Sequence, residues 1–110
     1  MNMDSDGFVA RLDTMGAKAT EYAQARAQRI YIEQFRKSKK AMLMIASEGR
    51  TIADREADAY SDPEYIELLE GLKAAVEVEE KCRWALERLK IDVEVWRTQQ
   101  ANERFARDRV

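Results

Sequence analysis

The chain has 110 residues, a formal net charge of −2, and 36% charged residues with one proline and four glycines. This length fits one domain, and the composition is typical of long helices without β-type alternation, so we expect an all-α fold. Histidine is absent, so the usual base for catalysis at neutral pH is missing and we expect no enzyme activity.

The N-terminal part of the chain predicts a short segment followed by a long basic helix. Residues 1–16 form the segment, with Asp4 or Ser5 as a possible cap and Gly16 as a loosening point. Residues 17–48 predict the helix, which ends at Gly49. Its expected inner face, which faces another helix, is rich in small residues: Ala19, Ala23, Ala27, Ile30, Tyr31, Gln34, Ser38, Ala41, Met42 and Ile45.

A basic stripe is expected on the opposite side of this helix. At 100° per residue, Arg11 and four later cations fall within about 40° of one another. Such a row can follow a phosphate backbone, and a nearby tyrosine can stack on a base. The candidate nucleic-acid contacts are Lys18, Tyr22, Arg26, Arg29, Arg36, Lys37, Lys39 and Lys40. The alternatives are a solvated helix face, or one that pairs with acidic residues 62–80 of a neighbour.

A short helix is predicted over residues 51–60, with Thr51 as its cap, and it reverses the chain so that the long helices run antiparallel. Charge is segregated along the sequence. Residues 17–47 have seven Lys/Arg and two Glu (+5), residues 48–80 have three against eleven (−8), and residues 81–110 have eight against five (+3). This segregation indicates pairing between segments or subunits, or a localised basic surface.

The last predicted helix, over residues 62–107, carries the most regular pattern. Ser61 and Glu64 have capping-box spacing, and Pro63 suits the first turn. Apolar residues then recur at a period of 3.5, which predicts a coiled-coil-like seam: Tyr65, Leu68, Leu72, Ala75, Cys82, Leu86, Leu89, Val93 and Trp96. Glu79 interrupts this seam, so we expect it to pair with a basic residue across it.

A second apolar stripe beside the seam indicates another neighbour. Its expected oligomer-interface residues are Leu69, Val76, Trp84, Ile91 and Val95. A hairpin of two long helices buries a thin core, which also argues for an oligomer.

Metal, cofactor and membrane signals are missing from the sequence. The carboxylates of Glu77, Glu79 and Glu80 lack the Glu-x-x-His pattern of carboxylate metal bundles, so we expect no metal and no cofactor. Cys82 has no partner for an internal disulfide and lies at a seam position. No stretch is apolar enough to span a bilayer and no signal peptide is evident, which predicts a cytoplasmic protein.

Residues 30–105 resemble a known class of small helical proteins from tailed phages and prophages. The resemblance lies in the Lys-rich stretch 35–43, the acidic tyrosine-bearing stretch 53–60, and the stretches 64–72 and 91–97 with Asn102 following. In layout they are similar to the UvsY-type recombination mediators. The resemblance implies an oligomer that binds single-stranded DNA through Arg36, Lys37, Lys39 and Lys40 and helps a recombinase displace single-strand-binding protein.

The leading hypothesis is therefore an all-α, antiparallel helical hairpin that oligomerises and acts as a non-enzymatic recombination accessory bound to single-stranded DNA. Two alternatives stay open: a phage-type adaptor or inhibitor that binds a protein through its acidic segment 54–80, and a structural coiled-coil assembly.

Overall fold

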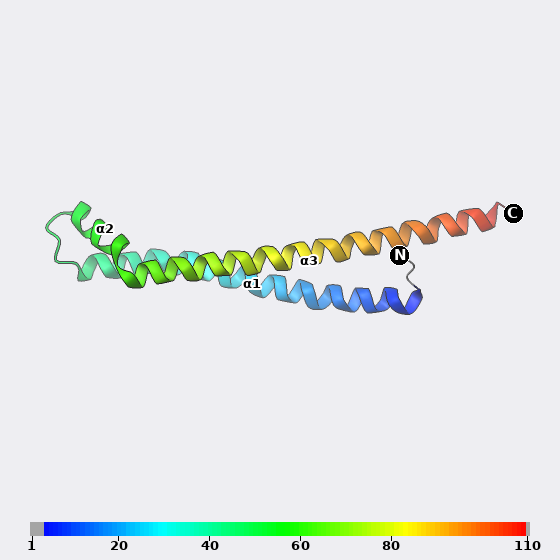
Figure 1. Cartoon of the computed structure of the whole chain (residues 1–110), viewed down its shortest axis with the longest axis horizontal. Coiled ribbons are helices and arrows are strands. Elements are labelled where there is room, and N and C mark those ends of the chain that lie inside the picture. The colour runs from blue at the N-terminus through cyan, green and yellow to red at the C-terminus, as the bar shows by residue number, and fades with distance from the viewer. Residues whose placement is uncertain (1–3, 110) are drawn as a thin grey trace. The chain divides into compact units, whose positions relative to one another are not determined.

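The computed structural model describes residues 4–109 and confirms the all-α, antiparallel helical hairpin (Figure 1). Helix α1 spans Ser5–Ala46, the short helix α2 spans Ile52–Ser61, and α3 spans Pro63–Asp108. No strand occurs in this part of the chain. None of these helices is both long and apolar enough to cross a membrane.

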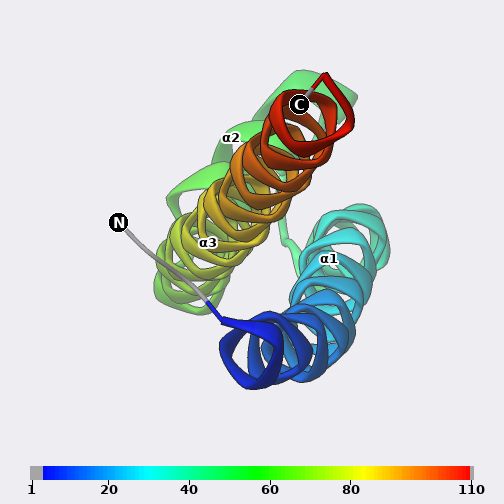
Figure 2. The ribbon, with the colours of Figure 1, turned by 90° about the vertical axis from the view of Figure 1, so that its right-hand side faces the viewer.

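The helices form two compact units, each described by itself. The terminal unit pairs the start of α1 with the second part of α3 (residues 4–23 and 80–109), and the central unit (residues 24–79) contains the rest of α1, all of α2 and the start of α3. Within the terminal unit, the start of α1 (blue) and the later part of α3 (orange to red) are two separate helices (Figure 2).

The helix ends follow local hydrogen-bond chemistry. The Asp4 carboxylate accepts a bond from the Gly7 N–H and begins α1 directly, so residues 5–16 belong to the first long helix and α1 continues through Gly16. Thr51 caps α2 as expected, because its hydroxyl accepts the Asp54 N–H at 3.0 Å.

The start of α3 differs from the expected capping box. Asp62 is the capping residue, since its Oδ1 accepts the Glu64 N–H at 2.8 Å, and Pro63 opens the helix. The Ser61 hydroxyl instead donates to carbonyl oxygens of the last turn of α2. The prediction of Ser61 as cap was wrong because α2 extends to Ser61, leaving Asp62 as the only residue between the helices.

The link after α1 also differs from expectation. Helix α1 ends at Ala46, and Gly49 does not adopt a positive φ, so it is not the predicted helix-ending glycine. Gly49 is needed for space instead: a Cβ there would lie 2.9 Å from the Asp54 Cβ and 3.0 Å from the Arg55 nitrogen. The Arg55 side chain fastens this turn by donating to the carbonyl oxygens of Gly49 and Met44.

The inner face of α3 is the predicted seam. Every predicted seam residue is buried or half-buried, with Tyr65 in the central unit and Leu86 and Val93 in the terminal unit among the most enclosed. Trp96 stacks on Phe8 of α1 with ring centroids 4.1 Å apart and planes 10° apart. The second stripe of α3 is exposed.

The inner face of α1 was predicted wrongly. The small-residue face from Ala19 to Ile45 is exposed along its whole length. The face that meets α3 is a different heptad, and each of its members is buried or half-buried: Phe8, Arg11, Met15, Lys18, Tyr22, Ala25, Arg29, Ile32, Arg36, Lys39 and Leu43. Five of these eleven side chains are cations. The seam of α1 is therefore largely polar, and it is held to α3 by charge as well as by burial.

Candidate nucleic-acid interface

The predicted basic stripe lies on the inner side of α1 and not opposite it. Arg11 pairs with Asp92 of α3 at 2.7 Å in the terminal unit, and Lys39 pairs with Glu64 at 2.8 Å in the central unit. Acidic residues of α3 thus form ion pairs with cations of the stripe that was expected to bind DNA. The predicted position of the stripe was wrong because the inner face of α1 was chosen by its apolar content, which left the charged residues on the outer side.

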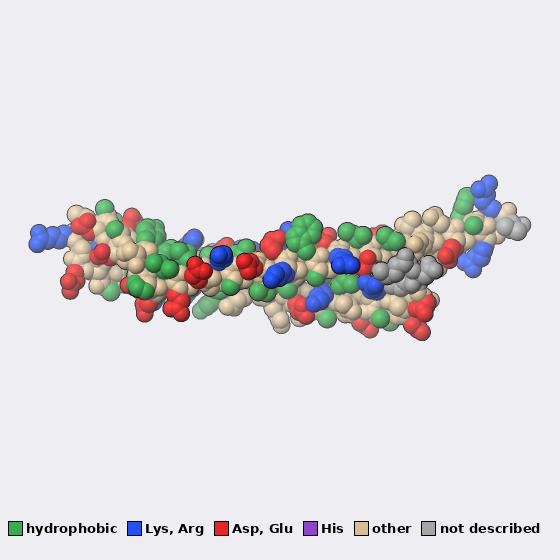
Figure 3. All heavy atoms as spheres, in the orientation of Figure 1, with side chains coloured by type: hydrophobic (Ala, Val, Ile, Leu, Met, Phe, Trp, Pro, Cys, Tyr) green, Lys and Arg blue, Asp and Glu red, His purple; other side chains and the backbone are tan. Residues whose placement is uncertain are grey.

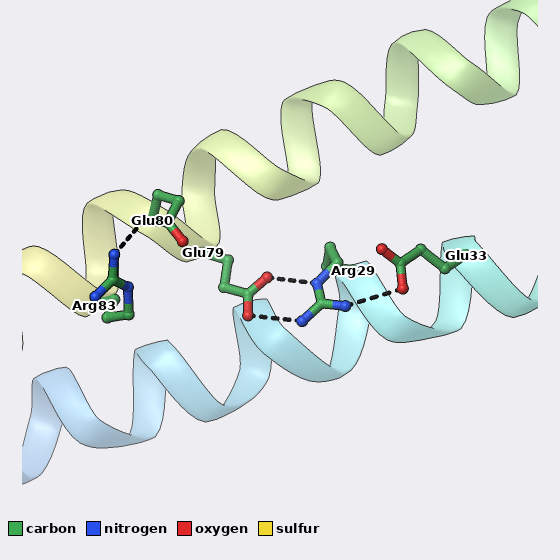
Figure 4. A network of polar contacts seen from close by, with 5 residues as sticks. All are labelled: Arg29, Glu33, Glu79, Glu80 and Arg83. Atoms are coloured by element: carbon green, nitrogen blue, oxygen red, sulfur yellow. Dashed lines mark hydrogen bonds and ion pairs between the residues drawn. The ribbon is translucent and has the colours of Figure 1, made fainter.

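Arg29 and Glu79 form the most enclosed of these contacts (Figure 4). Arg29 donates from Nε to Glu79 Oε2 at 2.6 Å and from Nη2 to Glu79 Oε1 at 3.0 Å, while Nη1 reaches Glu33 at 2.9 Å. Glu79 is only 8% exposed. The hydrogen bonds that Arg29 donates to Glu79, and then to Glu33, raise the pKa of Arg29 above its usual value. The expected pairing of Glu79 across the seam is confirmed, and Arg29 is engaged within the fold.

Three other cations of α1 lie together at a surface hollow in the central unit. Arg36, Lys37 and Lys40 of α1, Tyr60 of α2 and Tyr65 of α3 line a surface hollow of about 320 Å³. We call it the basic–tyrosine hollow. Helix α2 supplies Tyr60 from its last turn and the heptad of α3 supplies Tyr65 from its first turns, so the corner of the hairpin creates the hollow.

The electrostatics of the hollow come from its unpaired cations. Among residues 4–109, neither Arg36 nor Lys37 forms an ion pair, and the side chain of Lys37 is exposed. Lys40 lies 4.7 Å from the centroid of the Tyr60 ring and 3.4 Å from a Glu56 oxygen. The neighbouring Tyr60, and then the hydrogen bond to Glu56, raise the pKa of Lys40. The hollow is cationic at neutral pH.

Aromatic surface accompanies this charge. The rings of Tyr60 and Tyr65 meet edge to face with centroids 5.4 Å apart. Tyr65 is buried, whereas Tyr60 keeps about half of its surface exposed. An exposed ring beside unpaired cations can accept a base or another flat group while the cations hold a phosphate.

The other predicted contacts are not gathered at the hollow. Lys18 pairs with Glu21 at 3.1 Å and Tyr22 is half-buried in the terminal unit. Arg26 is exposed, and Lys39 lines another hollow beside Phe35. Tyr60 and Tyr65 were missed as site residues. The position of Tyr60 relative to Arg36 depends on the direction of α2, which no residue pattern predicts.

The predicted oligomer-interface residues are all exposed in the structure. In the terminal unit, Trp84 and Ile91 are each 62% exposed, and a shallow groove of about 380 Å³ includes Ile91 and Val95. The Arg83 guanidinium lies 4.7 Å from the centroid of the Trp84 ring. It also pairs with Glu80 at 2.7 Å (Figure 4). In the central unit, Leu69 and Val76 are also exposed.

Within residues 4–109, no group of three His, Cys, Asp or Glu side chains is placed to hold a metal ion, and Cys82 is half-buried in the seam. Comparisons with protein-family models, curated proteins and solved structures gave no match.

Proposed function

We propose that the chain is a non-enzymatic, self-associating helical protein that binds single-stranded DNA at the basic–tyrosine hollow, as a recombination accessory. One observation carries this proposal: Arg36 and Lys37 have no ion-pair partner among the described residues and lie beside the half-exposed Tyr60. The resemblance to UvsY-type mediators supports it and adds a recombinase or a single-strand-binding protein as candidate partners.

Single-stranded DNA fits this chemistry better than a duplex. A tyrosine ring needs an unpaired base face to stack on, and the bases of a duplex are stacked on one another. The cations need only a phosphate, which carries no sequence information. The proposed binding is therefore sequence-tolerant and dependent on salt.

The test measures the anisotropy of a labelled oligo-dT strand with the full chain and two charge-matched variants. Arg36→Glu with Lys37→Glu is expected to weaken binding by more than about tenfold at low salt, because two phosphate contacts become repulsive. Lys81→Glu with Arg88→Glu makes the same charge change at exposed α3 positions without ion pairs among the described residues, and it should bind nearly as the parent does.

Equal loss in both variants would show a general charge effect and would remove the hollow from the proposal. Circular dichroism checks that both variants stay helical. If the double change at the hollow unfolds the chain, the single change Lys37→Glu at its exposed position gives the same comparison.

A protein-binding or purely assembling module is the second candidate. The exposed second stripe of α3 favours it, because large apolar side chains in contact with water mark a surface that another helix covers. Three carboxylates of the acidic segment expected to bind a partner are paired within the chain: Glu56, Glu64 and Glu79. This candidate predicts no oligonucleotide binding even at low salt.

A further inference from the structure

The exposed side of α1 in the central unit has a regular pattern of its own. Its residues recur with steps of 3, 4, 4 and again 3, 4, so positions 27 and 38, and 30 and 41, are related by an 11-residue repeat. This period of 3.67 keeps a stripe straight along an α-helix. We call it the outer face of α1, formed by Ala27, Ile30, Gln34, Ser38, Ala41 and Ile45. All six residues are exposed.

The side chains of the outer face suit close helix packing. Ala27, Ser38 and Ala41 are small, so the backbone of another helix can approach, and Ile30 and Ile45 supply apolar surface. Ile45 is 80% exposed, with Tyr31 and Met42 exposed beside this face. Figure 3 shows apolar and charged side chains intermixed on the side of the molecule that it draws, without marking the residues of the outer face of α1. Solvation alone gives no reason for apolar residues at this spacing.

The second stripe of α3 in the central unit offers a matching surface. Ile66, Leu69 and Val76 are exposed, and they are flanked by Glu70 and Glu77. Neither of these two glutamates has an ion-pair partner among residues 4–109. Lys73 is the one exposed cation among residues 66–77 of α3. The exposed charge of this stretch is therefore negative on balance.

The charges decide which faces can meet. The outer face of α1 is flanked by Arg26 and Lys37, and the one acidic residue of 24–46, Glu33, is paired with Arg29. Packing two α1 faces together would oppose cations, and packing two α3 stripes together would oppose glutamates. Only an α1 face against an α3 stripe brings opposite charges together, and like charges across an interface are costly.

The solvent-accessible area of the chain is large enough for two of its faces to be buried in an assembly. The chain exposes 8337 Å², whereas a typical monomer of 12.8 kDa exposes about 6,300 Å². A standard interface buries about 800 Å² on each partner, so two such faces account for roughly 1,600 Å² per chain. The excess of about 2,000 Å² is of that size.

We infer that the outer face of α1 packs against the α3 stripe of a second copy of this chain, and this inference deepens the self-association in the proposed function. The outer face lies on the side of α1 opposite its seam with α3, so one partner copy cannot cover both the outer face and the α3 stripe. The contact is therefore heterologous and leaves each copy with one unused face. Repetition of such a contact produces a closed ring or an open filament and does not stop at a dimer.

Two face variants test this arrangement. Arg26→Glu with Ile30→Glu disables the α1 face, and Ile66→Lys with Glu70→Lys disables the α3 stripe; all four positions are exposed. Light scattering should give a mass above the dimer for the parent chain and 12.8 kDa for each variant alone. An equimolar mixture should give a heterodimer and nothing larger, because only one compatible pair of faces remains.

Other outcomes overturn the inference. A monomeric parent, a parent that stops at a dimer, a variant that still associates alone, or a mixture that stays monomeric each contradicts it. The two variants keep Arg36, Lys37, Lys40, Tyr60 and Tyr65, so oligonucleotide binding by the separated chains tests the hollow independently. Loss of assembly with retained binding, or the reverse, tells the two proposals apart.

Discussion

Arg29 of α1 and Glu79 of α3 make a two-point ion pair at a seam position where the flanking heptads of α3 place apolar residues. The pair favours this register of the two helices in the central unit, because a shift by one heptad would place an apolar residue of α3, Leu72 or Leu86, opposite Arg29. Buried charges serve this purpose in other coiled coils at some loss of stability.

Removal of one partner should be worse than removal of both. Glu79→Ala leaves the Arg29 guanidinium in the seam with Glu33 alone, and we expect the midpoint of thermal unfolding to fall by more than about 5 °C. Arg29→Leu with Glu79→Leu should recover most of this loss, since two apolar residues can pack in the seam. Thermal unfolding followed by circular dichroism measures both, and a double variant as unstable as the single one would contradict the account.

Two glycines should respond oppositely to alanine. Gly49→Ala places a Cβ against backbone atoms of α2 and should destabilise the chain by about 1–3 kcal/mol. Gly16→Ala meets nothing within 4 Å inside α1 and should stabilise it by about 0.5–1 kcal/mol. Denaturant unfolding of the two variants gives the comparison; a neutral Gly49→Ala would mean that the turn has room.

The cap of α3 can be identified by a pair of substitutions. Asp62→Ala removes the acceptor of the Glu64 N–H and should destabilise the chain by about 0.5–2 kcal/mol. Ser61→Ala should change the free energy of unfolding by less, because the Ser61 hydroxyl donates to a carbonyl oxygen within α2 and does not accept an N–H of α3. The reverse order in urea unfolding would restore Ser61 as the cap.

The ring of Tyr60 should matter more than its hydroxyl. Tyr60→Ala removes the surface proposed to stack on a base, at about 1–3 kcal/mol, which corresponds to roughly 5- to 150-fold weaker oligonucleotide binding. Tyr60→Phe keeps the ring and should bind within a few-fold of the parent. Anisotropy titrations of the two variants suffice, and equal affinities for Ala and Phe would exclude stacking on this residue.

The sequence predicted α3 well because its pattern is redundant. From Tyr65 to Trp96, apolar residues occupy the same heptad positions over four heptads. The charged residue at the one interrupted position, Glu79, indicates an ion pair across the seam. The bounds of α3 and of the short helix before it follow from the helix pattern and the Thr51 cap, whereas α1 begins twelve residues earlier than predicted. These features depend on neighbours in sequence.

Apolar content misled the prediction for α1. Its true seam includes Arg11, Lys18, Arg29, Arg36 and Lys39, whereas its exposed outer face is mostly small and apolar. Periodicity shows that two faces exist but does not show which one meets α3. The segregation of charge, +5 in residues 17–47 against −8 in residues 48–80, was the signal that could have indicated the answer.

The central claim is tested most directly by oligo-dT affinity across a salt series for the parent and for Arg36→Glu with Lys37→Glu. If both cations contact phosphates, the slope of log affinity against log salt should be shallower by about 1.4 per chain in the variant, since each single-strand contact contributes about 0.7. A slope and an affinity unchanged from the parent would contradict the basic–tyrosine hollow as the DNA site.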